Sequence, residues 1–355
     1  MVKKDLVFNL PGGIPRLPLH AGALRAWTEF GLPRPNTMIG ASAGIMAASA
    51  MPDLSEESFG RAIPVIGNLS PGQIFSFRSG LKIKLAALGV TSVLGLGAMI
   101  LFDHKLSKSK KAVLGLTGLA GLLATEVLVG KELLFSESLF SIDPLINLLN
   151  KELDFGAIFN SDIRIEALVT DMNKPGEVIF SNHDIENSDP NNPEHRNRWL
   201  NILRATSRLP GKFPFVIIDG INTVDGEVWT DLPIRQMEAY KRVIRFDYWA
   251  PLQPESAPKV WISDLTRSFD IMRDRCTRKK MDNYEYQRGY NPTLPRIFCI
   301  RLSPELMAQM PSIKIHSFTP DDMKAMMNLG YLAVKEQLPE IKTYFEEDAG
   351  YPRLA

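Results

Sequence analysis

One stretch of small residues, Gly-Ala-Ser-Ala-Gly at positions 40–44, lies between two short apolar runs. This order predicts a strand, a tight turn with Ser42 at its apex, and then a helix. The backbone of such a turn bends sharply, so a side chain larger than glycine at Gly40 or Gly44 would collide with the neighbouring strand or helix. The bend exposes the serine hydroxyl, and the positive end of the helix dipole points at the group that the hydroxyl attacks. The alternative interpretation is a helix start made of small residues and packed on a sheet.

A glycine-rich segment at residues 11–22 comes before this turn, between a predicted strand at 5–10 and a predicted helix at 23–30. Bare backbone N–H groups in such a segment can bind an anion. The segment lacks the G-K-[ST] and G-x-G-x-x-G spacings of the phosphate-binding loops. It suits an oxyanion loop that lies beside Ser42.

The composition excludes several classes of protein. The chain has 355 residues, with 41 lysines and arginines against 40 aspartates and glutamates, so no net charge favours nucleic acid as a partner. Cys276 and Cys299 provide neither a disulfide framework nor metal-ligand spacing, and we expect reduced thiols in a cytoplasmic protein with no metal or cofactor. The first apolar run is too short for a signal peptide.

The rest of the chain alternates between strand and helix patterns, which predicts an α/β sandwich. We expect a surface loop at 187–196, strands at 163–169, 177–180, 216–218, 243–246 and 297–302, and helices at 144–153, 199–207, 263–278 and from Thr319 onward.

Residues 80–135 differ from this pattern and predict an inserted hydrophobic helical hairpin between the two parts of one catalytic domain, 1–79 and 136–355. Two runs without charge, 85–102 and 112–125, are joined by a lysine-rich link. The first run is long enough for a helix of about 27 Å, close to the thickness of the hydrocarbon core of a bilayer. The hairpin either inserts into or docks on a membrane, or buries its apolar faces against the domain or another subunit.

A third motif follows, Asp225-Gly226, with Pro233 eight residues after the aspartate. The glycine-rich loop, the serine turn and this Asp-Gly pair resemble, in this order, the patatin-like phospholipases. That family has a loop G-G-G-x-R-G-x-x-x-x-G, then G-x-S-x-G, then D-G-G/A, often followed by N-x-P. Asp231 stands where the family often has asparagine. The turn matches fully, and the loop matches at Gly12, Gly13, Arg16 and Gly22.

The resemblance implies a three-layer α/β/α patatin-like sandwich with a central, mostly parallel sheet. It also implies a lipid acyl hydrolase of the phospholipase A or lysophospholipase type, in which Ser42 attacks the ester, Asp225 is the general base and an acyl-enzyme forms. In the loop Ile14 and Leu17 replace glycines, and the prolines at 15 and 18 have no N–H to donate. The oxyanion would therefore be bound by N–H groups of the loop residues Gly12, Gly13, Ile14, Arg16 or Leu17.

The residues around Asp225 bear on this role. An aspartate with an ordinary pKa of about 4 is a weak base at neutral pH, so the site should be apolar enough to raise that pKa. Val224, Val228 and Trp229 are compatible with such a site. The alternative is that Asp225-Gly226 is a hairpin turn. The pair Asp219-Gly220 is of the same type, and only the distance to Pro233 favours Asp225.

Two other functions stay open. A Ser-Asp-His triad of the α/β-hydrolase type would need a late histidine in an apolar context, and only His316 qualifies. The chain could instead be a catalytically silent, membrane-bound scaffold or assembly subunit. For the hydrolase we expect a phospholipid or other acyl-ester lipid as substrate, and a peripheral or hairpin-anchored place at a membrane. A homo-oligomer formed through residues 80–135 is the alternative use of the hairpin.

Overall fold

The computed structural model describes residues 4–13, 15–77, 140–174, 176–185, 189–210, 212–248, 261–311 and 317–346, with only the backbone at 77 and 261–274. A central sheet of eight strands organises them. The strands β10, β9, β1, β2 and β5 pair in parallel in this order, while β8, β7 and β6 are antiparallel. The predicted mixed α/β fold with a central sheet is confirmed. The bounds are β1 (Lys4–Leu10), β2 (Thr37–Gly40), β5 (Arg164–Asp171), β6 (Gly176–Ser181), β7 (Val216–Ile218), β8 (Ile221–Asp225), β9 (Tyr240–Phe246) and β10 (Arg296–Ile300).

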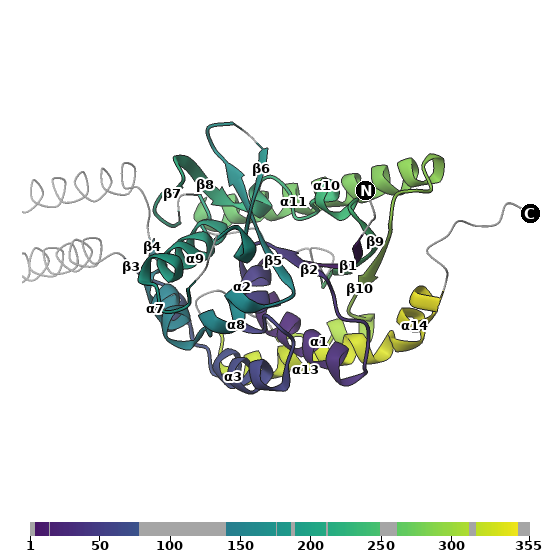
Figure 1. Cartoon of the computed structure of the whole chain (residues 1–355), viewed down its shortest axis with the longest axis horizontal. Helices are drawn as coiled ribbons and strands as arrows, with labels where there is room; N and C mark the ends of the chain where they lie inside the picture. The colour runs from purple at the N-terminus through teal and green to yellow at the C-terminus, as the bar shows by residue number, and fades with distance from the viewer. Residues whose placement is uncertain are drawn as a thin grey trace, which may run out of the picture.

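Helices cover both faces of this sheet. Figure 1 shows α10 (Ile234–Met237) and α11 (Trp261–Tyr290) on one side, and α1 (Arg16–Glu29) and α13 (Pro320–Glu336) on the other. Side chains of successive strand residues point to opposite faces. On β1, Leu6, Phe8 and Leu10 accordingly join the large core under α1 and α13, while Val7 joins a smaller core that includes Tyr284 of α11.

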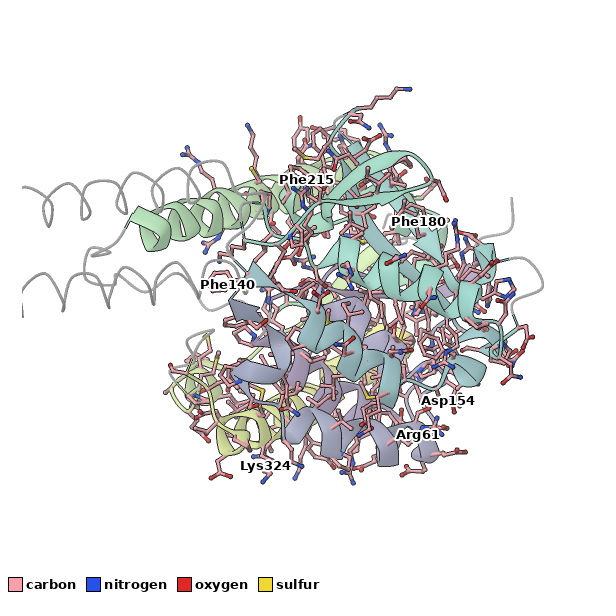
Figure 2. The ribbon with its side chains drawn as sticks, turned by 90° about the vertical axis from the view of Figure 1, so that its left-hand side faces the viewer. Arg61, Phe140, Asp154, Phe180, Phe215 and Lys324 are labelled. Atoms are coloured by element: carbon pink, nitrogen blue, oxygen red, sulfur yellow. The ribbon has the colours of Figure 1, made fainter. Side chains whose placement is uncertain are left out.

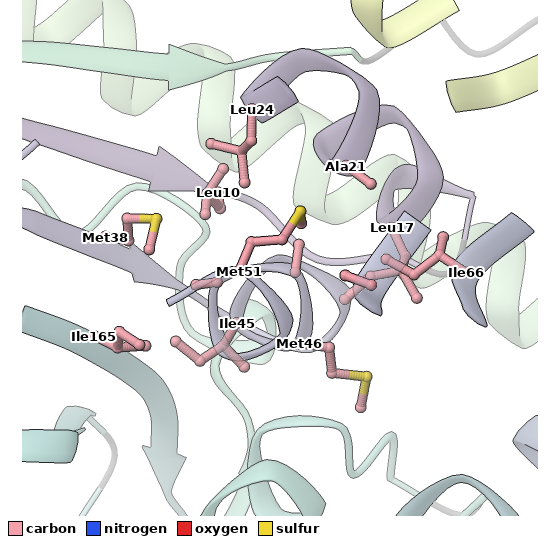
Figure 3. Close-up of a cluster of buried hydrophobic side chains, with 14 of the residues drawn as sticks. Leu10, Leu17, Ala21, Leu24, Met38, Ile45, Met46, Met51, Ile66 and Ile165 are labelled. Carbon is pink, nitrogen blue, oxygen red and sulfur yellow. The ribbon is translucent and has the colours of Figure 1, made fainter. Parts of the chain in front are cut away.

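Helix α2 (Ala43–Ala50) lies in the middle of the large core and is the helix that follows the serine turn. Figure 3 shows its side chains Ile45 and Met46 among buried residues of β2, β5, α1 and α3, with Met38 and Ile165 on the strand side. Ile45 is fully buried. Packing on all sides therefore holds the start of this helix in place.

The remaining elements surround this core. Arg61 of α3 forms an ion pair with Asp154, which caps α8 (Figure 2). The bounds of these remaining elements are α3 (Glu56–Gly67), α4 (Pro71–Ile74), α7 (Asp143–Glu152), α8 (Phe155–Asn160), η1 (Asn182–Asp184), α9 (Pro193–Thr206), η2 (Gly226–Val228), α12 (Pro304–Met307) and α14 (Leu338–Glu346).

Several predicted boundaries need correction. The predicted helix at 23–30 begins seven residues earlier, at Arg16, because Pro18 lies in the first turn, where a missing N–H costs no hydrogen bond. The predicted loop at 187–196 contains the start of α9, which Asn192 caps. The predicted helix from Thr319 is confirmed, with a capping box between Thr319 and Asp322.

The predicted hairpin at 80–135 lies outside the described residues, which end before it at Phe77 and resume after it at Phe140. Strand β3 (Ser76–Phe77) pairs antiparallel with β4 (Phe140–Ser141), so Phe77 lies opposite Phe140. Figure 2 labels Phe140 at the point where the described chain resumes. The chain therefore leaves and re-enters the domain at one place. Within the described ranges, no helix has the length and apolar character needed to span a bilayer.

Candidate active site

The predicted strand, turn and helix around Ser42 are confirmed: β2 ends at Gly40 and α2 begins at Ala43. Ser42 has φ 47° and ψ −122°, a strained conformation for a residue with a side chain. A strained serine of this kind is typical of a nucleophile at a strand-to-helix turn. The Ser42 N–H donates to both the carbonyl and the hydroxyl oxygen of Thr206, at 3.1 and 3.0 Å.

The two glycines of the turn lie against the end of β1. A Cβ on Gly44 would lie 1.8 Å from the Leu10 carbonyl oxygen, and one on Gly40 would lie 2.5 Å from it. Neither position can accept a side chain without moving backbone. The reason predicted for these glycines, close approach of a neighbouring strand, is therefore the one observed.

The glycine-rich loop lies directly beside the serine. Gly12 is buried, and a Cβ on it would lie 2.7 Å from the Ser42 Cβ and 2.9 Å from the Ala41 carbonyl oxygen. Gly13 has φ 109°, a left-handed conformation that favours glycine, and is partly exposed. The loop thus reaches the serine only because residue 12 has no side chain.

Strand β5 pairs with both β2 and β8, and this brings Asp225 to the same end of the strands as the serine turn. The last residue of β2, Gly40, pairs with Ala167, and Asp225 pairs with Val169. These two positions on β5 are two residues apart, about 7 Å along the strand. The register therefore places the end of β8 just beyond the level at which β2 ends, across β5 from the turn that carries Ser42.

Hydrogen bonds fix Asp225 in this place. Its side chain is buried, its N–H donates to the Arg208 carbonyl at 2.9 Å, and its carbonyl accepts from the Thr170 hydroxyl at 3.0 Å. The carboxylate oxygen Oδ1 accepts from the Glu227 N–H at 2.9 Å.

A comparison with protein-family models decides the family. The model of the patatin-like phospholipases matches residues 10–237, which include the glycine-rich loop, the serine turn and the Asp-Gly pair. This chain belongs to the patatin-like phospholipase family. Membership of this family supports lipid hydrolysis as the class of activity.

Solved structures give remote likenesses to this patatin-like chain. VipD from Legionella pneumophila has a TM-score of 0.37 and 11% identity, over 95% of this chain and 67% of that one. The type III effector protein ExoU has a TM-score of 0.35 and 11% identity, over 96% of this chain and 54% of that one. The patatin-like chain thus spans about half of the length of the second structure. No curated protein matches the sequence significantly.

A glutamate not predicted from the sequence occupies the patatin site. Glu227 stands where the family motif D-G-G/A has glycine or alanine, which was the available signal. Its Oε1 accepts from the Gly12 N–H at 2.5 Å and lies 3.4 Å from the Arg16 guanidinium. The side chains of Arg16 and Glu227 are each only 6% exposed, so this is a buried ion pair.

The predicted oxyanion donors are not equivalent in the structure. The Gly12 N–H donates to Glu227, and the Arg16 N–H donates to the Gly13 carbonyl at 2.8 Å. The Gly13 N–H has no partner in the described ranges of the chain. Leu17 is buried in the first turn of α1, and Ile14 lies outside the described residues.

The two Asp-Gly pairs have different surroundings. Asp219 and Gly220 have φ 52° and 78° and form the exposed turn between β7 and β8, where Asp219 pairs with Arg198 at 2.7 Å. Asp225 is the buried member of the two. Its burial does not come from Val228 and Trp229, which are themselves 45% and 47% exposed.

Asp231, at the position of the family's asparagine, belongs to a buried network beneath the site. Arg245 donates to the Asp231 carboxylate at 2.8 Å and to the Asn9 amide oxygen at 2.6 Å, and the Thr277 hydroxyl donates to Asp231 at 2.5 Å. Burial opposes ionisation, but the Arg245 charge and the Thr277 hydrogen bond hold the pKa of Asp231 below its usual value. The aspartate is therefore a charged partner of Arg245.

An apolar pocket opens one helical turn from the serine. Met46 of α2, whose N–H bonds to the Ser42 carbonyl, lines it together with Leu17 of α1. Other apolar lining residues include Ala62 and Ile66 of α3 and Leu149 of α7, and the charged Arg61 and Glu152 also line the pocket. His316, the residue required for a triad, lies outside the described residues. In the described part of the chain no cluster of residues could hold a metal ion.

Proposed function

We propose that this patatin-like chain hydrolyses fatty-acyl esters of membrane lipids, as a phospholipase A or lysophospholipase, through Ser42 and Asp225. The observation that carries the proposal is the strained Ser42 at the strand-to-helix turn with the backbone of Gly12 against it. Strain at this position is tolerated where catalysis needs an exposed hydroxyl. The β5 register, which aligns Asp225 with the same turn, supports the choice of base.

The reaction follows from the chemistry of these groups. Asp225 accepts the proton of Ser42 as the hydroxyl oxygen bonds to the acyl carbon, and backbone N–H groups of the glycine-rich loop stabilise the oxyanion. Collapse of this intermediate breaks the ester bond, and the leaving alcohol takes the proton from Asp225. A water molecule then releases the fatty acid from Ser42 by the same steps. The apolar pocket beside Met46 suits the acyl chain.

The test compares two site variants with a matched control on a chromogenic acyl ester. We expect Ser42→Ala and Asp225→Asn each to lower turnover by about 10³-fold or more while the melting temperature stays close to that of the wild type. Asp219→Asn changes the other Asp-Gly pair and should leave turnover unchanged. A fluorophosphonate should label Ser42, which mass spectrometry can locate.

If His316→Ala lost as much activity as Ser42→Ala, the result would favour a Ser-Asp-His triad over the Ser-Asp dyad. Absence of both labelling and turnover in the wild type would instead favour the catalytically silent scaffold.

We further propose that residues 80–135 form the hydrophobic hairpin of a three-layer patatin sandwich and hold the protein at the cytoplasmic surface of a membrane. Two charge-free runs and the lysines between them support this proposal, since lysines can reach lipid headgroups while their stems stay in the apolar layer. The β3–β4 pair gives both ends of the segment one common exit point. Packing of the hairpin in a homo-oligomer is the competing outcome.

A further inference from the structure

Glu227 has a direct connection with each of the three parts of the site. Its carboxylate accepts from the Gly12 N–H of the glycine-rich loop, and its own N–H donates to the Asp225 carboxylate. Its Cδ and the Ser42 Cβ lie 3.2 Å and 2.7 Å from the same point, the position that a Cβ on Gly12 would take. The glutamate carboxylate therefore lies beside the serine side chain.

An anion at this position competes with the reaction. The Gly12 N–H is one of the donors expected to stabilise the negatively charged oxygen of the tetrahedral intermediate. A hydrogen bond from an N–H to a carboxylate is roughly twice as strong as one to a neutral carbonyl. The ester carbonyl of a substrate is neutral before attack, so it cannot easily replace Glu227 at this donor.

Glu227 is not well placed to act as a second general base. Its carboxylate is already engaged by the Gly12 N–H and by the Arg16 guanidinium. Arg16 also donates to the Gly12 carbonyl at 2.7 Å, which keeps the guanidinium beside the loop.

We infer that Glu227 is a resident anion of the oxyanion site, which must leave the Gly12 N–H before Ser42 can react; this inference rests on the proposed function. Arg16 lowers the free-energy cost of this movement. A buried carboxylate without a partner is strongly disfavoured. With Arg16 beside it, the carboxylate keeps an ion-pair partner after the Gly12 N–H is released to the substrate. Glu227 therefore lowers the basal rate and sets how readily a substrate carbonyl enters the site.

The test measures the rate constant for fluorophosphonate labelling of Ser42 and kcat/KM on a soluble chromogenic ester in three variants. Glu227→Ala restores the small residue of the family motif, and we expect it to raise both quantities by about tenfold or more, since a single oxyanion donor is worth about 10² to 10³. Glu227→Gln keeps the shape with a weaker, neutral acceptor and should lie between Glu227→Ala and the wild type. Glu238→Ala, a partly exposed glutamate outside the site, is the control and should match the wild type.

Each outcome of the labelling experiment supports or overturns the inference. Equal or slower labelling of Ser42 in Glu227→Ala overturns the inference while the proposed hydrolase stands. If the fluorophosphonate labels Ser42 in Glu227→Ala but not in the wild type, the inference is supported and the wild type is not the proposed hydrolase. No labelling in any variant overturns both. If Glu227→Ala does not fold, as judged by its melting temperature, Glu227→Gln decides by the same comparison.

Discussion

At the scale of single residues, a buried polar side chain helps to hold the glycine-rich loop in place. His20 is an example: it lies on α1, it is fully buried, and its Nε2 donates to the Pro11 carbonyl at 2.7 Å. This contact fixes the loop just before Gly12. Burial, opposed by the hydrogen bond to Pro11, lowers the pKa of His20 to about 3. The imidazole is therefore neutral in the folded protein.

A neutral buried histidine predicts acid sensitivity. The unfolded chain binds a proton at His20 below about pH 6.5, whereas the folded chain does not until about pH 3, so the free energy of unfolding falls as the pH drops through this window. Between pH 6.5 and pH 5 this residue should account for a loss of about 2 kcal/mol. His20→Gln, which can still donate to Pro11, should remove that loss in urea unfolding experiments at the two pH values. Equal pH dependence in the variant and the wild type would contradict the prediction.

At the scale of elements, a pair of glycines sets how closely two helices approach. A Cβ on Gly22 of α1 would lie 1.8 Å from the Met327 carbonyl oxygen of α13, and one on Gly330 of α13 would lie 2.0 Å from the Leu19 carbonyl oxygen of α1. The close contact of α1 and α13 holds α1, and so the loop that begins it, against the sheet. Gly22 matches the family's loop pattern, but it lies within a helix, and its role is in packing.

Replacement of either glycine should separate the two helices. We expect Gly22→Ala and Gly330→Ala each to lower the free energy of unfolding by about 3 kcal/mol, because the added methyl group meets backbone that cannot move alone. Gly60→Ala is the control: Gly60 is exposed on α3 with no atom near its Cβ position, so alanine should stabilise the helix by up to about 1 kcal/mol. Urea unfolding measures all three. A stability unchanged in Gly22→Ala would show that the helices are not in contact there.

At the scale of the whole molecule, the residues that flank the 80–135 segment lie together, because β3 pairs with β4. The pair of Phe77 with Phe140 holds the two ends together, and the Phe140 N–H donates to the Lys212 carbonyl at 2.9 Å. The strands of the eight-stranded sheet that the structure describes all come from residues before Phe77 or after Phe140. The described sheet and its cores should therefore form without this segment.

Deletion of residues 82–131, with a short Gly/Ser bridge, tests the membrane proposal. We expect a folded and more soluble protein that hydrolyses soluble esters like the full chain but loses most of its activity on phospholipid vesicles. Sedimentation with liposomes should be strong for the full chain and weak for the deletion variant. A full chain that stays in the supernatant, and that changes from oligomer to monomer on deletion, would assign the segment to subunit packing.

The sequence alone determined the elements whose signals are local. The order of apolar run, Gly-x-Ser-x-Gly and apolar run identified the turn at Ser42, because such a bend excludes side chains on either side of the serine. Thr319 and Asp322 identified the start of α13, because a capping box lies within four consecutive residues. The family resemblance came from the order of three such local motifs.

Only the tertiary structure decided what depends on residues far apart in the chain. Asp219 and Asp225 are each followed by glycine, and the register of β8 on β5 separates an exposed turn from a buried carboxylate. Glu227 meets Gly12 across 215 positions of sequence, and no local pattern reports such a contact. The first turns of α1 pack on α13 where Leu19 approaches Gly330, a contact that the local sequence does not report. Local steric rules therefore placed the serine, while strand register and burial placed the groups around it.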